Sequence, residues 1–376
     1  MNSYIEICKQ KLNAIVEGAD SFSVHKEYIL TSIQNRVKEA DYIIVCGLSP
    51  LGRRCREYVG QYTKAKVSVF DIREEQYINI PICKGKKNLY IICSREDAQK
   101  YLNLVPRVDS EVLSYNELLL FDEIFSVPNS LLHNQKFIID CMENVFLYAT
   151  EYLEMLNALQ DVFSTELLAK WLLYRLYLDI SLMSNVGGIG KPYFAPEIIE
   201  VKEDEVFVDA GGYDGDTLAD FLEYTNGHYK KYYFFEPETS VFEKAYTKYS
   251  FDERIVFLKK GISNKTGIEY FDTELADVPE MLKSETGNVA VEVTALDDLE
   301  LVPTFIKMDI EGAECDALDG AEQMIRKYLP KLAICVYHRP NDILDIFHRI
   351  QNYGYQRYFL RAEKNTLDYD IVLYAV

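Results

Sequence analysis

The sequence predicts an α/β protein whose C-terminal half is a parallel, doubly wound sheet finished by an antiparallel hairpin. From residue 206 onward, short apolar runs alternate regularly with helical patterns, an order typical of parallel sheets covered by helices. The last two apolar runs, GYQRYFL and YDIVLYA, are separated only by a short turn, so they are expected to pair antiparallel. The length of 376 residues favours two or three domains.

Residues 1–135 are expected to form a Rossmann-like α/β domain. Residues 1–40 have helical spacing of apolar side chains, and the chain then predicts strand, turn, helix and a second strand that ends at Asp71. NLYIICS supplies a third strand. The glycine fingerprint of a dinucleotide site is incomplete, because Ser49 replaces its middle glycine and Pro50 follows. This turn belongs either to a nucleotide pocket or to a scaffold that binds a partner or nothing.

Residues 136–190 are expected to form a helical connector. Between residues 140 and 183, apolar and aromatic residues occupy nearly every face of two helical stretches, which predicts helices buried on more than one side. Such helices pack between domains or across a homodimer. SNVGGIGKPYF ends them, and we expect a catalytic domain over residues 191–376.

The sequence of the catalytic domain predicts five strands before the final hairpin. In chain order the elements are EVFVDA, a helix from Thr217, KYYFFE, a helix from Thr239, RIVFLKKG, TFIKMDI, a helix from Ala313, KLAICVY and a helix from Asn341. Residues 266–293 interrupt this order and are expected to be an inserted hairpin over the sheet edge.

The charge and cysteine content exclude several partners and compartments. With 60 acidic against 40 basic residues the net charge is −20, which opposes binding to nucleic acid or anionic membranes. The eight cysteines show no CxxC pairing and are interpreted as reduced core thiols. No leader pattern and no stretch of about 18 uncharged apolar residues is recognisable. We therefore expect a cytoplasmic protein.

The first strand of the catalytic domain opens into DAGGYDGDT, a glycine-rich turn crowded with Asp209, Asp214 and Asp216. These carboxylates would repel a pyrophosphate, because each like-charge pair at a few Å costs on the order of 4 kcal/mol at an effective dielectric of about 20. The second strand ends at Glu236, whose carboxylate suits two ribose hydroxyls. S-adenosylmethionine, with its ammonium and sulfonium, satisfies both strands, whereas NAD leaves the aspartates unexplained.

The later strand ends supply further candidates. Gly261 and Ile262 are expected either to flank an adenine or to form an ordinary strand-end turn. In KMDIEGAE, alternation places Lys307 and Asp309 on one side of a central strand, where charges are costly unless they are paired or functional.

Further acidic residues follow the fourth strand of the catalytic domain, and a histidine follows the fifth. Glu314 is expected to cap the next helix, and His338 is expected to be a base or an orienting group, although a lone histidine is commonly structural. Asp309 and Glu311 offer hard oxygen ligands for Mg²⁺ or Ca²⁺, but two carboxylates do not by themselves predict a metal site. Tyr193 is expected either to close over a cofactor or simply to pack.

Six stretches in order, YFAPEII, VFVDAGGYDGDT, FFEPE, VTALDDL, FIKMDIEGAE and VYHRPNDI, resemble the FkbM family of S-adenosylmethionine-dependent methyltransferases over about residues 160–376. The resemblance implies a Rossmann-like methyltransferase core and methyl transfer to a hydroxyl of a sugar, polyketide or similar small acceptor. The expected catalytic residues are Lys307, Asp309, Glu311 and His338. The expected cofactor-binding residues are Asp209, Gly211, Gly212, Tyr213, Asp214, Gly215, Asp216, Thr217, Glu236, Pro237, Gly261, Ile262 and Asp309.

We therefore expect an O-methyltransferase acting by in-line displacement, with His338 or Asp309 accepting the proton of the acceptor hydroxyl. One alternative is an NAD(P)-dependent or nucleotide-sugar-binding enzyme that uses the N-terminal domain. Another is a non-catalytic binding or scaffold protein. The sequence leaves open the acceptor, the ligand of the N-terminal domain, any need for a metal, and the oligomeric state.

Overall fold

The computed structural model describes residues 3–73, 80–94, 97–126, 134–184, 186, 191–272, 282–283, 287–362 and 371–376. The chain divides into two compact units. The first takes in Met1–Leu156 and Glu166–Gly187, and the second takes in Asn157–Thr165, Gly188–Glu363 and Asp370–Val376. The finer division into residues 1–135, 136–190 and 191–376 stays a prediction.

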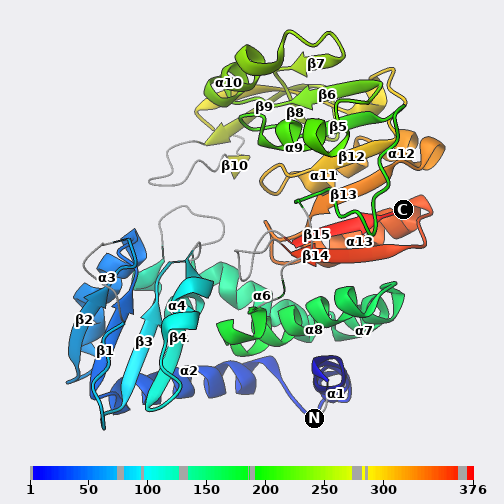
Figure 1. Cartoon of the computed structure of the whole chain (residues 1–376). Helices are drawn as coiled ribbons and strands as arrows, with labels where there is room; N and C mark the ends of the chain where they lie inside the picture. Colours follow the sequence, from blue (N-terminus) through cyan, green and yellow to red (C-terminus); the bar gives the residue numbers. More distant parts are fainter. Residues whose placement is uncertain are drawn as a thin grey trace. The chain divides into compact units, whose positions relative to one another are not determined.

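A four-stranded parallel sheet organises the described part of the first unit, in the order β2-β1-β3-β4 (Figure 1). The strands β1 and β3 are buried because they lie in the centre of the sheet, which explains their continuous apolar sequences. The sequence reading missed β4, an edge strand whose half-exposed sequence SEVLS has no apolar run. The bounds are β1 Tyr42–Cys46, β2 Lys66–Phe70, β3 Asn88–Ile92 and β4 Ser110–Ser114.

Helices pack together beside this sheet. Helix α5 contacts α2 and α6, and α1 contacts α6. A capping box starts α5: Glu117 N donates to Ser114 Oγ over 3.3 Å, and Ser114 N donates to Glu117 Oε2 over 2.7 Å. The bounds are α1 Tyr4–Val16, α2 Phe22–Glu39, α3 Pro50–Tyr58, α4 Ala98–Leu104, α5 Tyr115–Phe121, α6 Gln135–Leu147, α7 Ala149–Ala158 and α8 Val162–Tyr177.

The described part of the second unit contains a seven-stranded sheet in the order β14-β15-β13-β12-β5-β6-β7. The five strands from β7 to β13 are parallel, and β15 pairs antiparallel with both β13 and β14. This confirms the predicted parallel sheet with an antiparallel C-terminal hairpin. The bounds are β5 Val206–Ala210, β6 Lys231–Phe235, β7 Ile255–Leu258, β12 Phe305–Met308, β13 Lys331–Cys335, β14 Tyr358–Ala362 and β15 Ile371–Ala375.

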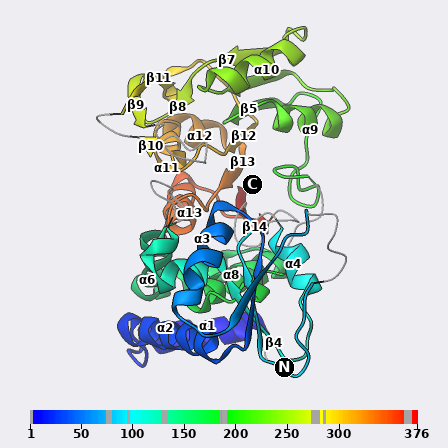
Figure 2. The ribbon, with the colours of Figure 1, turned by 90° about the vertical axis from the view of Figure 1, so that its left-hand side faces the viewer.

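Helices cover both faces of this sheet. Figure 2 shows α9 and α10 on one side and α11, α12 and α13 on the other. Helices α9, α10, α11 and α13 begin within one residue of the positions that the sequence predicts, whereas α12 was not predicted. Their bounds are α9 Asp216–Tyr224, α10 Thr239–Tyr249, α11 Glu314–Asp319, α12 Glu322–Tyr328 and α13 Asp342–Tyr353.

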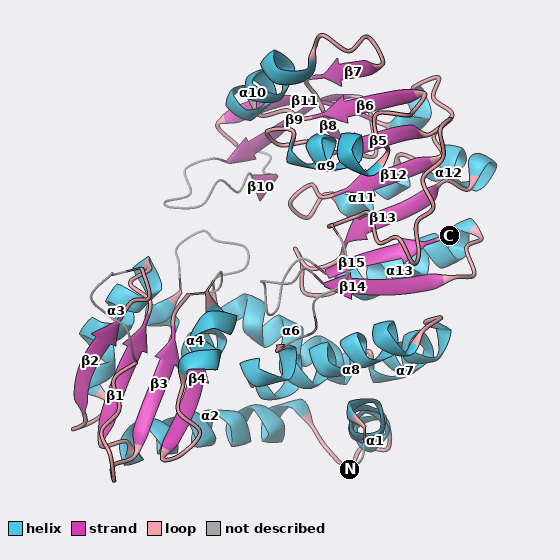
Figure 3. Ribbon diagram, in the orientation of Figure 1, coloured by secondary structure: helices cyan, strands magenta, loops and turns pink. Residues whose placement is uncertain are grey.

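The inserted hairpin belongs to a separate small sheet, in the order β10-β9-β11-β8 (Figure 3). Strands β9 and β11 pair antiparallel, which confirms a hairpin, although part of its tip lies outside the described residues. The described strands of this hairpin are hydrogen-bonded within the small sheet and not to an edge strand of the seven-stranded sheet. The bounds are β8 Gly261–Ile262, β9 Gly267–Asp272, β10 Leu282–Lys283 and β11 Val289–Thr294.

Several other sequence features can be followed in the structure. All eight cysteines are described, none of them forms a disulfide, and six are buried. The aromatic and apolar side chains of α8 that suggested a dimer are mostly buried, Trp171 and Tyr174 among them. Among the described residues, none of the helices combines the length and apolar character that a membrane span requires.

Candidate active site

The glycine-rich turn after β5 uses its backbone amides inside the protein. Gly211 N and Gly212 N both donate to Phe235 O, over 3.0 and 2.9 Å, and Gly215 N donates to Gly212 O over 3.0 Å. Tyr213 N donates to Glu236 Oε2 over 3.0 Å. A phosphate at a Gly-rich turn is normally held by such amides. Because they are already engaged, this turn is a poor anion site.

The glycines are required because the turn lies against neighbouring strand ends. Gly211 has φ +81°, and a Cβ there would lie 1.9 Å from Asp309 O. A Cβ on Gly212 would lie 2.2 Å from the Phe234 ring. The turn is therefore held tightly between the ends of β6 and β12.

Asp209 and Lys307 form a buried pair beneath the turn. Lys307 Nζ lies 3.1 Å from Asp209 Oδ1 and donates to Gly211 O over 2.6 Å. Tyr232 OH donates to Asp209 Oδ2 over 2.5 Å. Burial by itself would lower the pKa of Lys307, but the charges of Asp209 and Asp309 outweigh it and raise that pKa. The cationic lysine thus fixes the position of the turn.

Glu236 links the glycine-rich turn to the end of β6. Besides accepting from Tyr213, its carboxylate accepts from Glu238 N over 2.7 Å. Burial raises the pKa of Glu236, against the opposing effect of the two amides. A carboxylate has about four lone-pair sites, so acceptor capacity remains for ligand hydroxyls.

The end of the glycine-rich turn puts an acidic residue, Asp216, at the start of α9. Asp216 is the first residue of the helix, and its Oδ1 accepts from Thr217 N over 2.6 Å. Tyr213 is exposed and has φ +48°, while Asp214 and Pro237 are half-buried. Tyr213, Asp214 and Asp216 thus lie in the turn after β5, and Pro237 lies just after β6.

Gly261 and Ile262 are positioned differently. They form β8, which pairs with β11 in the small sheet and does not belong to the turn that ends β7. Their expected role beside an adenine stays a prediction.

Asp309 follows β12 and is surrounded by hydroxyl groups. Tyr193 OH donates to Asp309 Oδ2 over 2.8 Å, and Tyr337 OH lies 3.5 Å from Oδ1. Burial by itself would raise the pKa of Asp309, but Lys307, His338 and Tyr193 outweigh it and lower the pKa. The side chain is 28% exposed. Asp309 is therefore an ionised carboxylate that a ligand can reach.

His338 is enclosed by carboxylates. Its Nδ1 lies 2.9 Å from Glu314 Oε1, and its Nε2 lies 3.5 Å from Asp309 Oδ1 and 3.7 Å from Glu311 Oε2. Burial by itself would lower the pKa of His338, but these carboxylates outweigh it and raise the pKa to about 10. The structure thus brings Asp309, Glu311 and His338 together.

Glu314 is the first residue of α11, but its side chain contacts the preceding turn and a histidine instead of capping the helix. It is fully buried, accepts from Ile310 N over 2.9 Å and contacts His338. The sequence reading missed this contact. A buried acid just after a strand-end turn, together with a histidine at the next strand end, was the available signal.

In the first unit, the turn with the incomplete glycine fingerprint makes hydrogen bonds to other groups of the protein. Ser49 Oγ accepts from Gly52 N over 3.1 Å and donates to Cys93 O over 2.6 Å. Asp71 Oδ2 accepts from Leu48 N over 2.8 Å, and the carboxylate pairs with Arg73. These contacts favour the scaffold interpretation of this turn.

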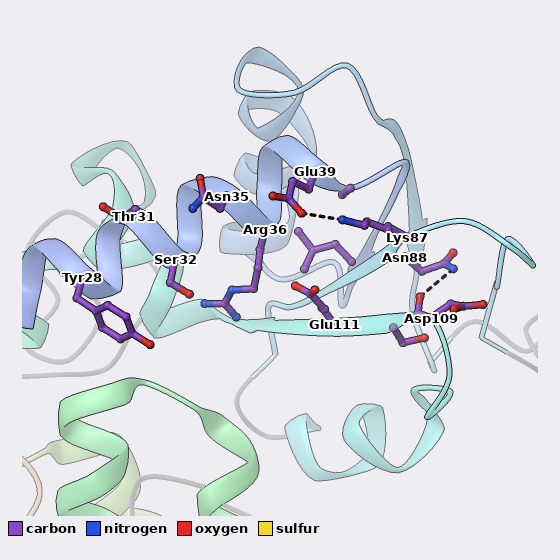
Figure 4. Close-up of a pocket in the computed structure, with 13 residues that line it drawn as sticks. Tyr28, Thr31, Ser32, Asn35, Arg36, Glu39, Lys87, Asn88, Asp109 and Glu111 are labelled. Carbon is purple, nitrogen blue, oxygen red and sulfur yellow. Dashed lines mark hydrogen bonds and ion pairs between the residues drawn. The ribbon is translucent and has the colours of Figure 1, made fainter. Parts of the chain in front are cut away.

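A pocket of about 580 Å³ lies elsewhere in the first unit, between α2 and the amino ends of β3 and β4 (Figure 4). Open α/β sheets bind ligands at the carboxyl ends of their strands, so this is not the predicted nucleotide position. Glu39 and Lys87 form an ion pair at its rim. The lining residues are Tyr28, Thr31, Ser32, Asn35, Arg36, Glu39, Ala40, Lys87, Asn88, Leu89, Asp109, Ser110 and Glu111.

Comparison with solved structures supports a methyltransferase fold. A methyltransferase FkbM from Methylobacillus flagellatus KT is 21% identical, with a TM-score of 0.66 over 97% of this chain and 100% of its own. An rRNA methylase from Streptococcus thermophilus is 17% identical, with a TM-score of 0.31 over 50% of this chain and 96% of its own. A fibrillarin from Aeropyrum pernix with natively bound S-adenosyl-L-methionine is 11% identical, with a TM-score of 0.33 over 48% and 70%. Only the first of these three supports a statement about fold.

Comparison by sequence gives the family. No curated protein matches this chain. The family model described as the methyltransferase FkbM domain matches residues 209–357, which include the glycine-rich turn, Glu236, Asp309 and His338. This confirms the resemblance that the sequence stretches predict, and residues 209–357 of this chain form a methyltransferase FkbM domain on a Rossmann-like methyltransferase fold.

Proposed function

We propose that this protein is an S-adenosylmethionine-dependent methyltransferase that methylates a hydroxyl oxygen of a small molecule or of a sugar or polysaccharide precursor. The observation that carries the proposal is the glycine-rich turn. Its amides are engaged with Phe235 O and Glu236, while Asp214 and Asp216 add negative charge beside it. Such a turn favours a ligand with cationic groups over a pyrophosphate.

Glu236 supplies the second contact to the cofactor. Its carboxylate lies at the end of β6, next to the turn, where a ribose can donate two hydroxyl hydrogen bonds. The cofactor supplies an electrophilic methyl group on a sulfonium, which leaves as a neutral thioether when the methyl group is transferred.

Asp309 is the residue that we assign as proton acceptor. It is ionised and reachable, and Tyr193 OH holds its Oδ2. His338 lies between the buried carboxylate of Glu314, 2.9 Å from its Nδ1, and Asp309 Oδ1, 3.5 Å from its Nε2, so we assign it the role of orienting Asp309 and not that of the base. Alignment of the acceptor oxygen with the methyl group can supply roughly 7–11 kcal/mol of the acceleration.

The binding experiment is calorimetric titration of the full chain with S-adenosylmethionine, S-adenosylhomocysteine and NADH. We expect the first two to bind and NADH not to bind. Binding of NADH without S-adenosylmethionine would overturn the proposal in favour of a nicotinamide-dependent enzyme.

The transfer experiment uses a radiolabelled methyl donor and a panel of sugars, nucleotide-sugars and small alcohols, with product analysis by mass spectrometry. We expect label on an acceptor oxygen. The Asp309→Asn variant should lose transfer. Label on nitrogen or carbon would reject the O-methylation assignment while leaving the cofactor assignment intact.

The remaining expectations stay part of the proposal. They are a cytoplasmic protein, a small-molecule or carbohydrate acceptor, no nucleic acid or membrane as a partner, and a homodimer formed through the helices of residues 140–183. Light scattering of the purified protein tests the dimer.

A further inference from the structure

His338, a buried histidine that follows β13, lies among carboxylates and, in the part of the chain that the structure describes, without regular hydrogen bonds from its ring nitrogens. His338 is 2% exposed, and three carboxylates from the segment after β12 face its ring. Within the described residues, neither ring nitrogen makes a hydrogen bond of regular geometry, and Glu314 Oε2 is also buried without one. Buried polar atoms of native proteins are normally satisfied, so Nε2, which lies 3.5 Å from Asp309 Oδ1 and 3.7 Å from Glu311 Oε2, calls for a missing partner.

The two ring nitrogens have different surroundings. Nδ1 is the nitrogen closest to a carboxylate, at 2.9 Å from Glu314 Oε1. A histidine whose one nitrogen faces a buried carboxylate while the other is directed to a cation is the usual arrangement around protein-bound metals. In that tautomer Nδ1 carries the hydrogen, and Nε2 presents its lone pair.

Nε2 is directed toward two oxygens at distances that fit ligands of one ion. Asp309 Oδ1 lies at 3.5 Å and Glu311 Oε2 at 3.7 Å. Both exceed the usual hydrogen-bond range of about 2.7–3.2 Å. An ion with bonds of about 2.0–2.2 Å to nitrogen and oxygen separates neighbouring ligand atoms by roughly 3.0–3.5 Å. Small side-chain adjustments would therefore close the site.

A neighbouring hydroxyl and the local backbone turn the carboxylate oxygens of Asp309 and Glu311 toward the histidine. Tyr193 occupies Asp309 Oδ2, which leaves Oδ1 on the side of the histidine. Glu311 has φ +55° and Gly312 has φ +89°, so the chain turns sharply after Asp309 and brings the Glu311 carboxylate back toward His338. One ligand atom each from Asp309, Glu314 and His338 lies within 4.8 Å of the others.

We propose that His338 Nε2, Asp309 and Glu311 bind one divalent transition-metal ion, with Glu314 as the positioning residue of the histidine. An imidazole together with carboxylates suits Mn²⁺, Fe²⁺, Co²⁺ or Zn²⁺ better than Ca²⁺. Glu311 is 53% exposed and Asp309 is 28% exposed, so the open side of the ion faces solvent. Any part of this ion in holding the acceptor hydroxyl rests on the proposed function, but the binding of the ion does not.

The test uses the full chain after treatment with a chelator and its removal. Mn²⁺ and Zn²⁺ are titrated by calorimetry, and the Mn²⁺ complex is examined by pulsed electron paramagnetic resonance for coupling to an imidazole nitrogen. We expect one site per chain with a nitrogen coupling. His338→Gln should abolish that coupling and weaken binding at least 10-fold, and Glu314→Gln should weaken binding by about 10–100-fold.

Two variants keep the test informative if a buried substitution disturbs folding. Glu311→Gln changes an exposed side chain and should still weaken binding about 10-fold or more. His348→Gln in α13 is the matched control and should bind like the unmodified chain. The proposal is overturned if the unmodified chain shows no saturable site, or if the His338 and Glu311 variants bind as tightly as the control. S-adenosylmethionine binding by the metal-free chain is measured in parallel, so that failure of the metal site is distinguished from failure of the proposed function.

Discussion

Lys307 and Asp209 lie directly opposite each other on the neighbouring strands β12 and β5, and their side chains form an ion pair with an Nζ–Oδ1 distance of 3.1 Å. Both side chains are almost completely buried, at 2% and 0% exposure. The pair therefore ties two central strands together where they meet the glycine-rich turn. Both residues are among the expected site residues, and in the structure their ion pair supports the turn.

Removal of one partner should be strongly destabilising. In Lys307→Met, Asp209 loses its buried counter-charge, and we expect the free energy of unfolding in urea to fall by about 3–5 kcal/mol. The double variant Asp209→Asn with Lys307→Met should recover part of that loss. Lys87→Met, which breaks an exposed pair with Glu39, is the control and should leave the free energy of unfolding nearly unchanged. A loss below 1 kcal/mol for Lys307→Met would contradict this account.

Gly212→Ala should disrupt the turn through a steric clash. The added Cβ would lie 2.2 Å from the Phe234 ring, so the turn or the ring must move. We expect a loss of at least about 2 kcal/mol in unfolding free energy, as for other overpacked sites, and loss of cofactor binding. Gly211→Ala combines a clash with backbone strain, whereas Gly227→Ala has a similar positive φ and open space, so it should cost only about 1–2 kcal/mol and leave binding intact. Equal effects at all three glycines would show that close packing of the turn is unimportant.

Glu236→Ala should weaken cofactor binding. It removes the expected ribose contacts and the acceptor of Tyr213 N, so we expect a loss of about 1.5–3 kcal/mol in calorimetric S-adenosylmethionine affinity. Glu238→Ala is the control, because that carboxylate caps α10 and should affect stability but not affinity. Unchanged affinity in the Glu236 variant would remove this residue from the cofactor site.

Tyr193→Phe should reduce turnover without changing cofactor affinity. The variant loses the hydroxyl that donates to Asp309 Oδ2 over 2.8 Å, while the ring and its packing remain. A hydrogen bond to a charged group is worth about 1.5–3 kcal/mol, which corresponds to a decrease in kcat of roughly 10-fold or more. The measurement is steady-state methyl transfer together with calorimetry. A variant with full kcat would show that Tyr193 only packs.

Glu117 should make the stability of the protein depend on pH. Burial raises the pKa of Glu117 to about 7 from 4.5, against the opposing effects of Arg36 and the Ser114 amide. Because the folded state then binds the proton more tightly than the unfolded chain, the contribution of Glu117 to the unfolding free energy falls as pH rises from 4.5 to about 7. The fall is up to about 3 kcal/mol. Urea unfolding at about pH 5 and pH 8 should show a steeper fall for the unmodified chain than for Glu117→Gln, and identical profiles would contradict the assignment.

Local patterns were sufficient for much of the fold and for the location of the candidate site. Strand and helix periods, with glycine and proline at the breaks, predicted the helix starts near Thr217, Thr239, Ala313 and Asn341 to within one residue. The missed strand β4 lacked such a pattern because it lies at a sheet edge with polar residues. The pairing of Gly261 and Ile262 with β11 could not be predicted, because two residues cannot show which sheet they join, and their role beside an adenine stays a prediction.

The sequence by itself determined the α/β class, the alternation of strands and helices along the catalytic domain, and the set of acidic, glycine and histidine residues at the strand ends. These features depend on the period of hydrophobic burial and on the rule that parallel strands deliver their ends to one edge. Only the tertiary structure decided which side chains pair. Asp209 contacts Lys307 and Tyr232, and His338 contacts Glu314, because contacts between residues far apart in the chain depend on register, burial and side-chain direction.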